Sequence, residues 1–600
     1  MYYFYDIETY PNVFSLVVKH GENIRVFKNS YDRNDTDEMI DFLWSLKINK
    51  KIMVGYNNIN FDYPVLHYIL LNPPATVADI YNKAMSIINA PYYDRFSHII
   101  WDRDRFVKQL DLFRIHHFDN MAKATSLKII EFNMRSENIQ DLPFPPGTFL
   151  TNDQIDTLIK YNIHDVTETE KFFYKSEDQI NLRTALSEKY NKDVSNFNDK
   201  KLGVDYLITR LEEIRPGSCY NSHHRPNQTE RENIAFKDII FPYIQFAHPE
   251  FKRVHDYLTK LVITDTKNSI TDLTCTINDF TYVFGTGGIH GSVTPSRIEE
   301  DAYYMIKDID VTSYYPSIGI VNRVYPEHLG DTFCDIYADI KKQRLSYPKG
   351  SPEYKMLKLS LNGSYGDSNN EYSPLYDPQY TMTITINGQL MLCMLAEQLM
   401  NVPDLKMIQI NTDGITVKYP RHLDGYVTNA CKWWESVTKL ELESVTYHQM
   451  FIRDVNNYIA VGNKIKRKGV YEYELEWHQN HSALVVRKAA EASLLHNIPV
   501  EDFILTHNDI MDFMLRTKVP RTSSLMLDNR QLQNICRYYI SNTGGSLYKM
   551  MPPLAGKTSK RKIGINVGWL VTECNNMKNY REDINYQYYI NEADKLTRGM

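Results

Sequence analysis

The chain has 600 residues, 43% of them hydrophobic and 24% charged, with a formal net charge of −6. This composition is typical of a soluble protein and excludes a disordered or fibrous class. The length indicates about three to five domains. The seven cysteines are dispersed without a C-x-x-C pair, and we find neither a signal peptide nor an apolar run of membrane-spanning length. We therefore expect a soluble, cytoplasmic protein with no membrane partner, and the acidic total still allows local basic surfaces that bind nucleic acid.

Two predicted strands near the N-terminus carry carboxylates. The first covers Tyr2–Ile7, and because Asp6 and Glu8 are two positions apart their side chains point to the same face. Carboxylates this close repel each other unless a cation lies between them. A second apolar segment leads into Asn57 and then Asp62. Each pattern has an ordinary alternative, since D-x-E pairs are common and the second segment is also compatible with an Asx turn.

A helix is predicted over Tyr161–Phe173. Tyr161 and Asp165 lie one turn apart in it and therefore share a face. A solvated helix with a half-buried tyrosine is the alternative. Together, the two strands and this helix supply four carboxylates and a tyrosine, a set of oxygen ligands suited to divalent cations.

Two carboxylates follow predicted strands in the middle of the chain. A buried strand leads into Asp310 within KDIDVTSYYPS (Lys307–Ser317), where the carbonyl of Val311 would add a further oxygen ligand for a cation. The segment Lys406–Tyr419 is predicted to be a hairpin with Asp413 at its tip. Taken singly, the first is also compatible with a turn-forming aspartate and the second with an ordinary Asp-Gly turn.

Between these carboxylates a helix is predicted over Lys355–Gly366. Lys358, Asn362 and Tyr365 share one of its faces, which in isolation is typical of a solvated surface. Two carboxylates, however, can hold a pair of metal ions for an in-line phosphoryl displacement. A lysine on a nearby helix can neutralise a triphosphate, and tyrosine or asparagine can lie against a base. The order of these features indicates a nucleotidyl transferase.

Two other segments are candidate nucleic-acid contacts. The glycine-rich segment Phe284–Gly291 contains Gly287 and Gly288, although glycines alone are weak evidence for phosphate binding. The basic run after Val461 contains Lys466 and Lys468, for which an exposed charge run is the alternative. Lysines that contact phosphates set register and salt dependence without reading sequence.

The motifs DVTSYYPS, KLSLNGSYG and NTDG resemble, in this order, the three polymerase motifs of family B DNA polymerases. The run Glu371–Leu392 resembles the segment of that family that leads from the fingers back into the palm. The resemblance implies metal ligation by Asp310, Val311 and Asp413; dNTP binding by Arg344, Lys358, Asn362, Tyr315 and Tyr365; and DNA binding by Gly287, Gly288, Lys466 and Lys468. The resemblance also implies that Tyr315 lies under the sugar of the incoming nucleotide and excludes a 2′-hydroxyl.

The N-terminal carboxylates resemble, in order, the three motifs of a DEDDy 3′–5′ proofreading exonuclease. The resemblance implies that two metals are held by Asp6, Glu8, Asp62 and Asp165. It also implies that Tyr161 orients the attacking water and that Asn57 contacts the substrate strand. The cofactor expected at both sites is Mg²⁺, two ions per site, with Mn²⁺ as a substitute.

The fold implied is α/β and multi-domain: a ribonuclease H-like exonuclease followed by a right-hand polymerase of palm, fingers and thumb. We expect the exonuclease at 1–185, a connecting region with the first part of the palm at 186–330, the fingers at 331–372, the second part of the palm at 373–475 and the thumb at 476–600, with the basic segment Gly556–Lys562 in the thumb. The expected partners are primer-template DNA, dNTPs and a processivity factor or single-strand-binding protein.

Departures from the family pattern qualify this interpretation. Asn411 replaces the first Asp of the usual DTD motif, Asn456 and Asn457 replace basic residues before Tyr458, and Gly363 and Ser364 replace the usual Ser and Leu. The intervals between the three motifs leave no room for the insertions of protein-primed members. We therefore expect a compact, nucleic-acid-primed enzyme of a bacterial virus, acting in the host cytoplasm with weak processivity of its own.

Two alternatives remain at this stage. A nuclease whose polymerase half has become a DNA-binding platform is favoured by Asn411 and the Asn456–Asn457 pair. It is disfavoured by the retention of Asp310, Asp413, Lys358 and Arg344. A non-enzymatic replication scaffold would leave all the carboxylates of both sites idle. Turnover dependent on Mg²⁺ would separate the scaffold from the two enzymes.

Overall fold

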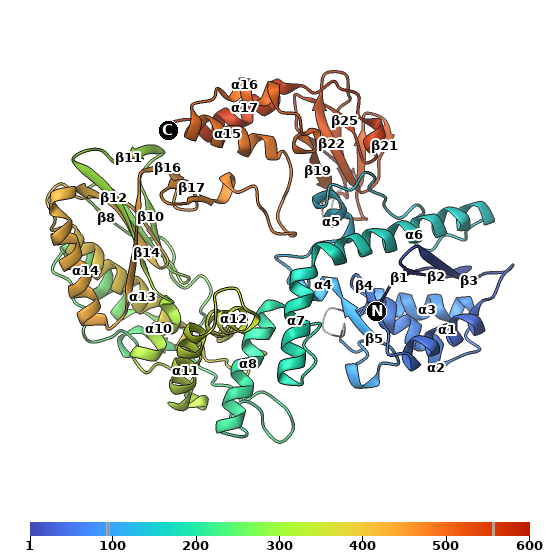
Figure 1. Cartoon of the computed structure of the whole chain (residues 1–600), viewed down its shortest axis with the longest axis horizontal. Coiled ribbons are helices and arrows are strands. Elements are labelled where there is room, and N and C mark those ends of the chain that lie inside the picture. Colours follow the sequence, from blue (N-terminus) through green and yellow to red (C-terminus); the bar gives the residue numbers. More distant parts are fainter. Residues whose placement is uncertain (92–93, 95, 555–558) are drawn as a thin grey trace. The chain divides into compact units, whose positions relative to one another are not determined.

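In the computed structural model, residues 1–91, 94, 96–554 and 559–600 are described, and the chain divides into two compact units. The first unit contains Met1–Asn198, Glu474–Val486 and Ile504–Asn591, and the second contains Asp199–Tyr473, Arg487–Phe503 and Glu592–Met600. Both mix helices and strands, so the expected α/β multi-domain class is confirmed (Figure 1). None of the helices in the described residues is long and apolar enough to cross a membrane.

The N-terminal part of the first unit is built on a five-stranded mixed sheet with the strand order β3-β2-β1-β4-β5. Its strands are β1 (Tyr2–Tyr10), β2 (Val13–His20), β3 (Asn23–Asn29), β4 (Ile52–Gly55) and β5 (Lys108–Asp111). β1 pairs with β2 antiparallel and with β4 parallel. The strand predicted at Tyr2–Ile7 is thereby confirmed as the central strand of this sheet.

Helices cover both faces of this sheet (Figure 1). The helices of this part are α1 (Thr36–Ile48), α2 (Asp62–Leu71), α3 (Val77–Ile88), α4 (Leu112–Ile115), α5 (Leu127–Asn133), α6 (Asn152–Lys175) and α7 (Glu177–Tyr190). Tyr5 and Ile7 of β1 join the core beneath α1, α2 and α3, whereas Phe4 joins a second core with Val166 and Phe172 of α6. Because side chains alternate along a strand, Asp6 and Glu8, two and four positions after Phe4, also face α6.

The C-terminal part of the first unit contains two small antiparallel sheets. Their strands are β19 (Leu515–Lys518), β22 (Ile535–Ser541) and β25 (Leu570–Glu573) in one, and β21 (Arg530–Gln531), β20 (Ser524–Leu527), β23 (Leu547–Met551) and β24 (Arg561–Ile565) in the other. The first of these sheets is joined to the segment that follows α5: Ile139 N–H donates to the carbonyl of Asn575 (3.0 Å), and Met577 N–H donates to that of Glu137 (2.9 Å).

The predicted domain limits, including a thumb at 476–600, stay predictions. Part of the predicted basic segment Gly556–Lys562, residues 556–558, lies outside the described residues.

The second unit is built on a seven-stranded antiparallel sheet with the order β15-β12-β14-β13-β10-β9-β8. Its strands are β8 (Leu273–Ile277), β9 (Phe280–Phe284), β10 (Ile289–Ser292), β12 (Tyr304–Val311), β13 (Lys406–Asn411), β14 (Gly414–Pro420) and β15 (Leu442–Tyr447). The helix α13 (Pro378–Leu399) is buried along almost its whole length and packs against α10 (Tyr314–Val321) and α14 (Asp424–Thr438). The predicted hairpin is confirmed as β13 and β14.

A helical layer and a second sheet complete this unit. Its other helices are α8 (Asp199–Ile214), α9 (Pro249–Lys260), α11 (Thr332–Ser346) and α12 (Pro352–Asp367), of which α8, α11 and α12 pack together. The second sheet has the order β11-β16-β17-β18, with strands β11 (Ser296–Glu299), β16 (Gln449–Asp454), β17 (Asn457–Val461) and β18 (Ile465–Lys468). The remaining elements are the short pair β6 (Ile234–Ala235) and β7 (Val262–Ile263) and the helices α15 (Leu484–His496), α16 (Val500–Thr506) and α17 (Tyr586–Thr597). The helix predicted at Lys355–Gly366 is confirmed within α12.

Candidate active sites

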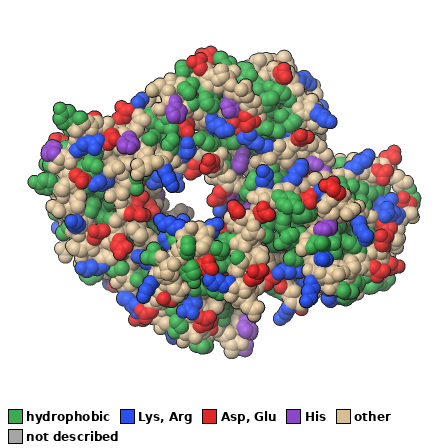
Figure 2. Space-filling model, viewed as in Figure 1, with side chains coloured by type: hydrophobic (Ala, Val, Ile, Leu, Met, Phe, Trp, Pro, Cys, Tyr) green, Lys and Arg blue, Asp and Glu red, His purple; other side chains and the backbone are tan. Residues whose placement is uncertain are grey.

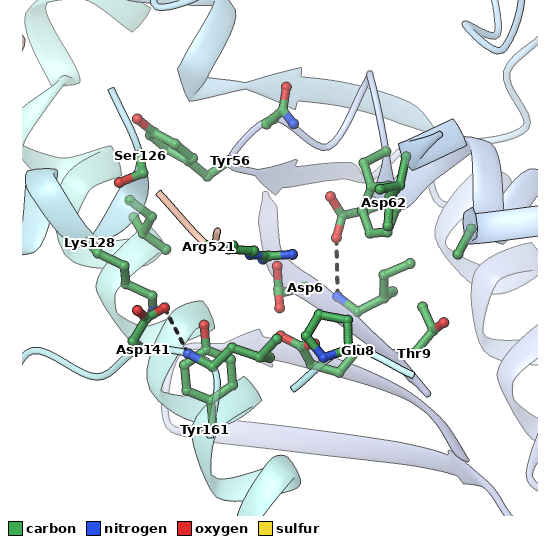
Figure 3. Close-up of a pocket in the computed structure, with 18 of the residues that line it drawn as sticks. Asp6, Glu8, Thr9, Tyr56, Asp62, Ser126, Lys128, Asp141, Tyr161 and Arg521 are labelled. Carbon is green, nitrogen blue, oxygen red and sulfur yellow. Dashed lines mark hydrogen bonds between the residues drawn. The ribbon is translucent and has the colours of Figure 1, made fainter. Parts of the chain in front are cut away.

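The structure brings together three of the N-terminal carboxylates predicted from the sequence. Asp6 and Glu8 project from β1 toward α6, which carries Asp165, and ligand oxygens of the three side chains lie within 4.8 Å of one another. Asp62 begins α2 and accepts a hydrogen bond from the backbone N–H of Ile7 at 3.2 Å (Figure 3). Asp6, Glu8 and Asp165 can therefore reach one cation, and Asp62 lies close enough to Asp6 to raise the pKa of that carboxyl.

Withdrawal from water and mutual repulsion make these four carboxyl groups hard to ionise. Burial, then Asp62, Glu8 and Asp165, raise the pKa of Asp6 well above its ordinary value. Burial raises the pKa of Glu8 to about 8, that of Asp62 to about 7 and that of Asp165 to about 6. Clustered carboxylates with raised pKa values are typical of a cation site, because a bound cation offsets the repulsion that the protein alone leaves.

One cation of the protein already lies in this cluster, and the sequence analysis missed it. Lys128 of α5 is buried, its ammonium contacts the carboxylate of Asp165 and is 3.1 Å from that of Glu131, and it lies 4.5 Å from the centre of the Tyr161 ring. His164 approaches Glu131 from the other side at 3.0 Å. A second possible group of metal ligands consists of Glu131, His164 and Asp165. Lys128, however, already forms ion pairs with both carboxylates of this group.

The carboxylates open into a cavity of about 760 Å³. Its lining includes Asp6, Glu8, Asp62, Tyr161 and Asn57, which the sequence had indicated (Figure 3). It also includes residues from the C-terminal strands, which the sequence had not indicated. The cavity has both a polar and an apolar wall, an arrangement suited to a ligand with phosphates and flat rings.

Asn57 is held at the cavity by its backbone. It has a left-handed conformation (φ 65°), which asparagine tolerates better than most residues, and its N–H donates to the carboxylate of Asp111 at 2.8 Å. The same buried carboxylate accepts from the N–H of Ile59 at 3.2 Å. Asp111 therefore fixes the loop between β4 and α2, and no motif in the sequence signalled this role.

The second pair of predicted carboxylates lies in the second unit, at the ends of adjacent strands. Asp310 is near the end of β12, opposite Gly414 in the ladder with β14, and Asp413 occupies the turn that connects β13 and β14. A Cβ on Gly414 would lie 1.9 Å from the Oδ1 of Asp310, so only glycine fits beside this carboxylate. The N–H of Val311 donates to the carbonyl of Asp413 at 2.8 Å, which locks the two segments together.

The environment of Asp310 raises its pKa to about 7, through burial first and then the charges of Asp308 and Asp413, while Lys466 acts in the opposite direction. Asp308, which the sequence analysis did not select, is buried two residues earlier on the same face of β12. Its carboxylate accepts hydrogen bonds from the hydroxyls of Thr416 and Tyr447, both at 2.6 Å, and lies 3.4 Å from the ammonium of Lys466.

Two tyrosines and the glycine-rich loop lie together beside the second pair of carboxylates. The rings of Tyr315 and Tyr365 are 4.6 Å apart between centroids, and the Tyr315 hydroxyl donates to the carbonyl of Gly287 at 3.1 Å. Gly288 has a φ of 152°, and a Cβ there would meet the side chain of Thr412 at 3.2 Å. The structure thus brings the β9–β10 loop, α10 and α12 to the turn that carries Asp413.

The predicted phosphate-binding residues lie on α11 and α12. The guanidinium of Arg344 is 3.4 Å from the Ser313 hydroxyl and 5.2 Å from the ring centre of Tyr354. Lys358 and Asn362 are exposed on α12, and Lys468 is exposed on the edge strand β18.

The residues that depart from the family pattern have local roles in turns. The Asn411 side chain accepts from the N–H of Thr412 at 2.7 Å, and the Asn457 amide donates to Asp454 at 2.8 Å. Over the face in view, Lys and Arg side chains are interspersed with Asp and Glu rather than gathered into one basic surface (Figure 2).

No family model and no curated protein matches this chain. Among solved structures, the chain is similar to the family B DNA polymerase from the hyperthermophilic archaeon Pyrobaculum calidifontis, with 15% sequence identity and a TM-score of 0.42, covering 100% of this chain and 78% of that one. At this level of similarity, function has to be inferred from the chain's own residues.

Proposed function

We propose that this protein is a DNA-directed DNA polymerase with a 3′–5′ exonuclease, which extends a nucleic-acid primer and removes mispaired 3′ ends. The observation that carries the proposal is the arrangement around Asp310 and Asp413. Two adjacent strand ends present carboxylates, a tyrosine pair lies beside them, and Arg344 and Lys358 lie on the two neighbouring helices. This arrangement suits a nucleoside triphosphate, which has anionic, sugar and base parts.

Both acidic sites fit Mg²⁺, with Mn²⁺ as a substitute, because each offers carboxylate oxygens, and burial together with repulsion between carboxylates raises the pKa of Asp6 in one and of Asp310 in the other. Asp310 and Asp413, with the carbonyl of Val311, would hold it in the second unit, and Asp6, Glu8, Asp62 and Asp165 would hold it in the first. When bound, such ions supply positive charge to the oxygens of a phosphoryl displacement.

The other residues of the polymerase site bind and orient the substrates. Arg344 and Lys358 neutralise the triphosphate, and Asn362 and Tyr365 line the nascent base pair. Tyr315 is held by its hydrogen bond to Gly287 and closes the space that a 2′-hydroxyl would need. Lys466 and Lys468 on β18, with the loop of Gly287 and Gly288, contact the DNA backbone.

In the exonuclease site, Tyr161 and Asn57 complete the set. The Tyr161 hydroxyl keeps its proton at physiological pH, because burial and then the charges of Asp165, Glu8 and Asp6 raise its pKa, so it can donate a hydrogen bond to the attacking water. Asn57 contacts the strand that is cleaved. The biological setting that we propose is replication of a viral genome in the host cytoplasm, with a processivity factor or single-strand-binding protein as partner.

Extension of a labelled primer on a longer template tests the proposal. We expect dNTP-dependent extension by the wild-type protein and a loss of roughly 10³-fold in Asp310→Asn, which keeps the shape of the side chain and removes its charge. A wild-type protein that shortens the primer but never extends it would instead support the nuclease with a DNA-binding platform, which the altered residues Asn411, Asn456 and Asn457 favour.

A further inference from the structure

One wall of the cavity around Asp6 and Glu8 comes from the other end of the chain. Residues 518–521, together with Asn534 and Ile535, line it in the first unit. Neither the sequence motifs nor the function proposed above gives this segment a role.

The fold holds this segment in place. Lys518 ends β19 opposite Ile535 of β22, and the N–H of the next residue, Val519, donates to the carbonyl of Asn534 at 2.8 Å. The Lys518 ammonium donates to the Ser126 hydroxyl at 2.8 Å, beside the helix that carries Lys128. This segment is therefore hydrogen-bonded to the N-terminal part of the first unit beside the cavity.

A buried arginine anchors the same strands a second time. Arg537 of β22 is 1% exposed and donates to the carbonyls of Ser136, Glu137, Cys574 and Asn575. A guanidinium with this many carbonyl partners fixes the position of its strand, because moving it would leave several buried polar groups unpaired. The side chains that follow β19 are thus presented to the cavity by a rigid support.

Arg521 is the side chain that this support presents. It is exposed, and its guanidinium makes no hydrogen bond or ion pair with any residue that the structure describes. Its charge nevertheless reaches the cavity, since it counts among the influences that lower the pKa of Glu8 and of Tyr10. Figure 3 shows the Arg521 side chain in the cavity, near Asp6. The Arg521 guanidinium, on the wall of the cavity that contains these carboxylates, is therefore available to bind an anion.

We propose that Arg521 binds a backbone phosphate of a DNA single strand whose 3′ end enters this cavity. The inference rests on the proposed exonuclease function and names a substrate-binding residue for it that lies outside the exonuclease motifs. Arginine stays charged at all physiological pH values and matches phosphate with two parallel hydrogen bonds. Phe61 and Tyr81 in the lining provide aromatic rings on which bases can stack. Apolar side chains lie in the same lining: Ile87, Ile88, Leu142 and Pro146.

Steady-state hydrolysis of a 5′-labelled oligothymidylate in Mg²⁺ tests this binding role. In Arg521→Ala we expect KM to rise about tenfold while kcat changes by less than about twofold, because the residue holds the strand away from the scissile bond. Arg521→Lys retains a charge and should recover part of the loss. The matched control is Arg530→Ala, an exposed arginine of the same region that faces Glu573 at 3.6 Å and is not part of the cavity wall.

An unchanged KM in Arg521→Ala, or an equal rise in Arg530→Ala, would overturn the inference. Faster hydrolysis in Arg521→Ala would also overturn it, because the guanidinium would then compete with the metal instead of binding the strand. If the wild-type protein does not shorten the strand at all, the exonuclease proposal fails by itself. Equilibrium binding of the same oligonucleotide, followed by fluorescence anisotropy, then decides the role of Arg521: about tenfold weaker binding by Arg521→Ala supports it, and equal binding contradicts it.

Discussion

The two acidic sites of this chain are built on opposite principles. In the first unit, Asp6, Glu8 and Asp165 can reach one cation with Asp62 beside them, and a buried lysine contacts Asp165. Asp62 and Asp165 are buried. In the second unit, Asp310 is half-buried and Asp413 is exposed, and the charge pair of Asp308 and Lys466 lies behind them. The first site gathers its carboxylates beside a buried lysine, and the second presents two carboxylates, one of them exposed.

This difference follows from what each site would bind. A site that hydrolyses a strand must supply most of the cation ligands itself, because a single scissile phosphate offers few oxygens. A site that joins a triphosphate to a primer receives additional oxygens from its substrate, so two carboxylates suffice. The comparison predicts that charge changes in the first unit alter its stability strongly, whereas those in the second unit mainly alter catalysis.

The largest effect is expected from Lys128→Met. Removing the ammonium leaves Asp165 and Glu131 without their shared partner in a buried place, which should lower the free energy of unfolding of the first unit by about 3 kcal/mol. Denaturant unfolding measures this. The control is Lys108→Met in the same unit, which breaks an exposed pair with Asp193 and should cost less than about 1 kcal/mol. Equal losses would show that the cluster does not depend on its lysine.

The pH dependence of the metal-free protein comes next. The pKa values of Glu8, Asp62 and Asp165 are raised to about 8, 7 and 6, so between pH 5 and 8 the folded state binds more protons than the unfolded state. Stability must then fall as pH rises through this window. We expect the Tm in EDTA to drop by roughly 5 °C or more from pH 5 to 8.

Two additions sharpen that experiment. Mg²⁺ should restore the Tm at pH 8, and Asp6→Asn should raise the Tm in EDTA at pH 8 while abolishing hydrolysis, because it removes one of the repelling charges. Asp310→Asn should reduce the fall in Tm by the share of one titrating group, because the pKa of Asp310 is also raised to about 7. A Tm that rises with pH in EDTA would contradict the charge arrangement described for the first unit.

A smaller effect is expected from Asp308→Asn. The amide oxygen can still accept from Thr416, but the NH2 group cannot accept from Tyr447, and the charge that faces Lys466 is lost. The ammonium is therefore no longer fixed near Asp310. Primer extension should slow by about tenfold, and single-strand hydrolysis should not change. Asp301→Asn, at an exposed turn, is the control. Normal extension by Asp308→Asn would assign the network to structure alone.

The smallest effect is expected from Tyr315→Val. It removes the ring that packs against Tyr365 and the hydroxyl bound to Gly287, which opens space below the sugar. Incorporation of ribonucleotides relative to deoxyribonucleotides should rise by about tenfold, while dNTP incorporation changes little. Competition between one dNTP and its rNTP in a single-nucleotide extension measures the ratio, and an unchanged ratio would remove Tyr315 from the sugar site.

The sequence predicted those parts of the sites that depend on local order. Asp6 and Glu8 share a face because of strand alternation, Tyr161 and Asp165 share a helix turn, and the hairpin tip places Asp413, so short patterns sufficed. Lys128 could not be recognised in this way. The sequence around Lys128 is typical of an ordinary helix surface. Only the packing of α5 against α6 buries the Lys128 ammonium among the carboxylates.

The same limit applies to the residues contributed from a distance. Asp308 alternates with Asp310 and was visible in principle, but its partners Thr416, Tyr447 and Lys466 come from three other strands. Arg521 lies in a segment with no motif, and it reaches the cavity around Asp6 and Glu8 because β22 is anchored beside α5. Long-range packing of this kind leaves no periodic trace in the sequence.

The most direct test of two separate active sites uses a 5′-labelled primer on a longer template in Mg²⁺, with and without dNTPs. Wild type, Asp310→Ala and Asp6→Ala are compared side by side. We predict that growth with dNTPs is lost only in Asp310→Ala and that shortening without dNTPs is lost only in Asp6→Ala. Loss of both activities in either variant, or shortening by the wild type under every dNTP condition, would contradict the account of one site for synthesis and another for hydrolysis.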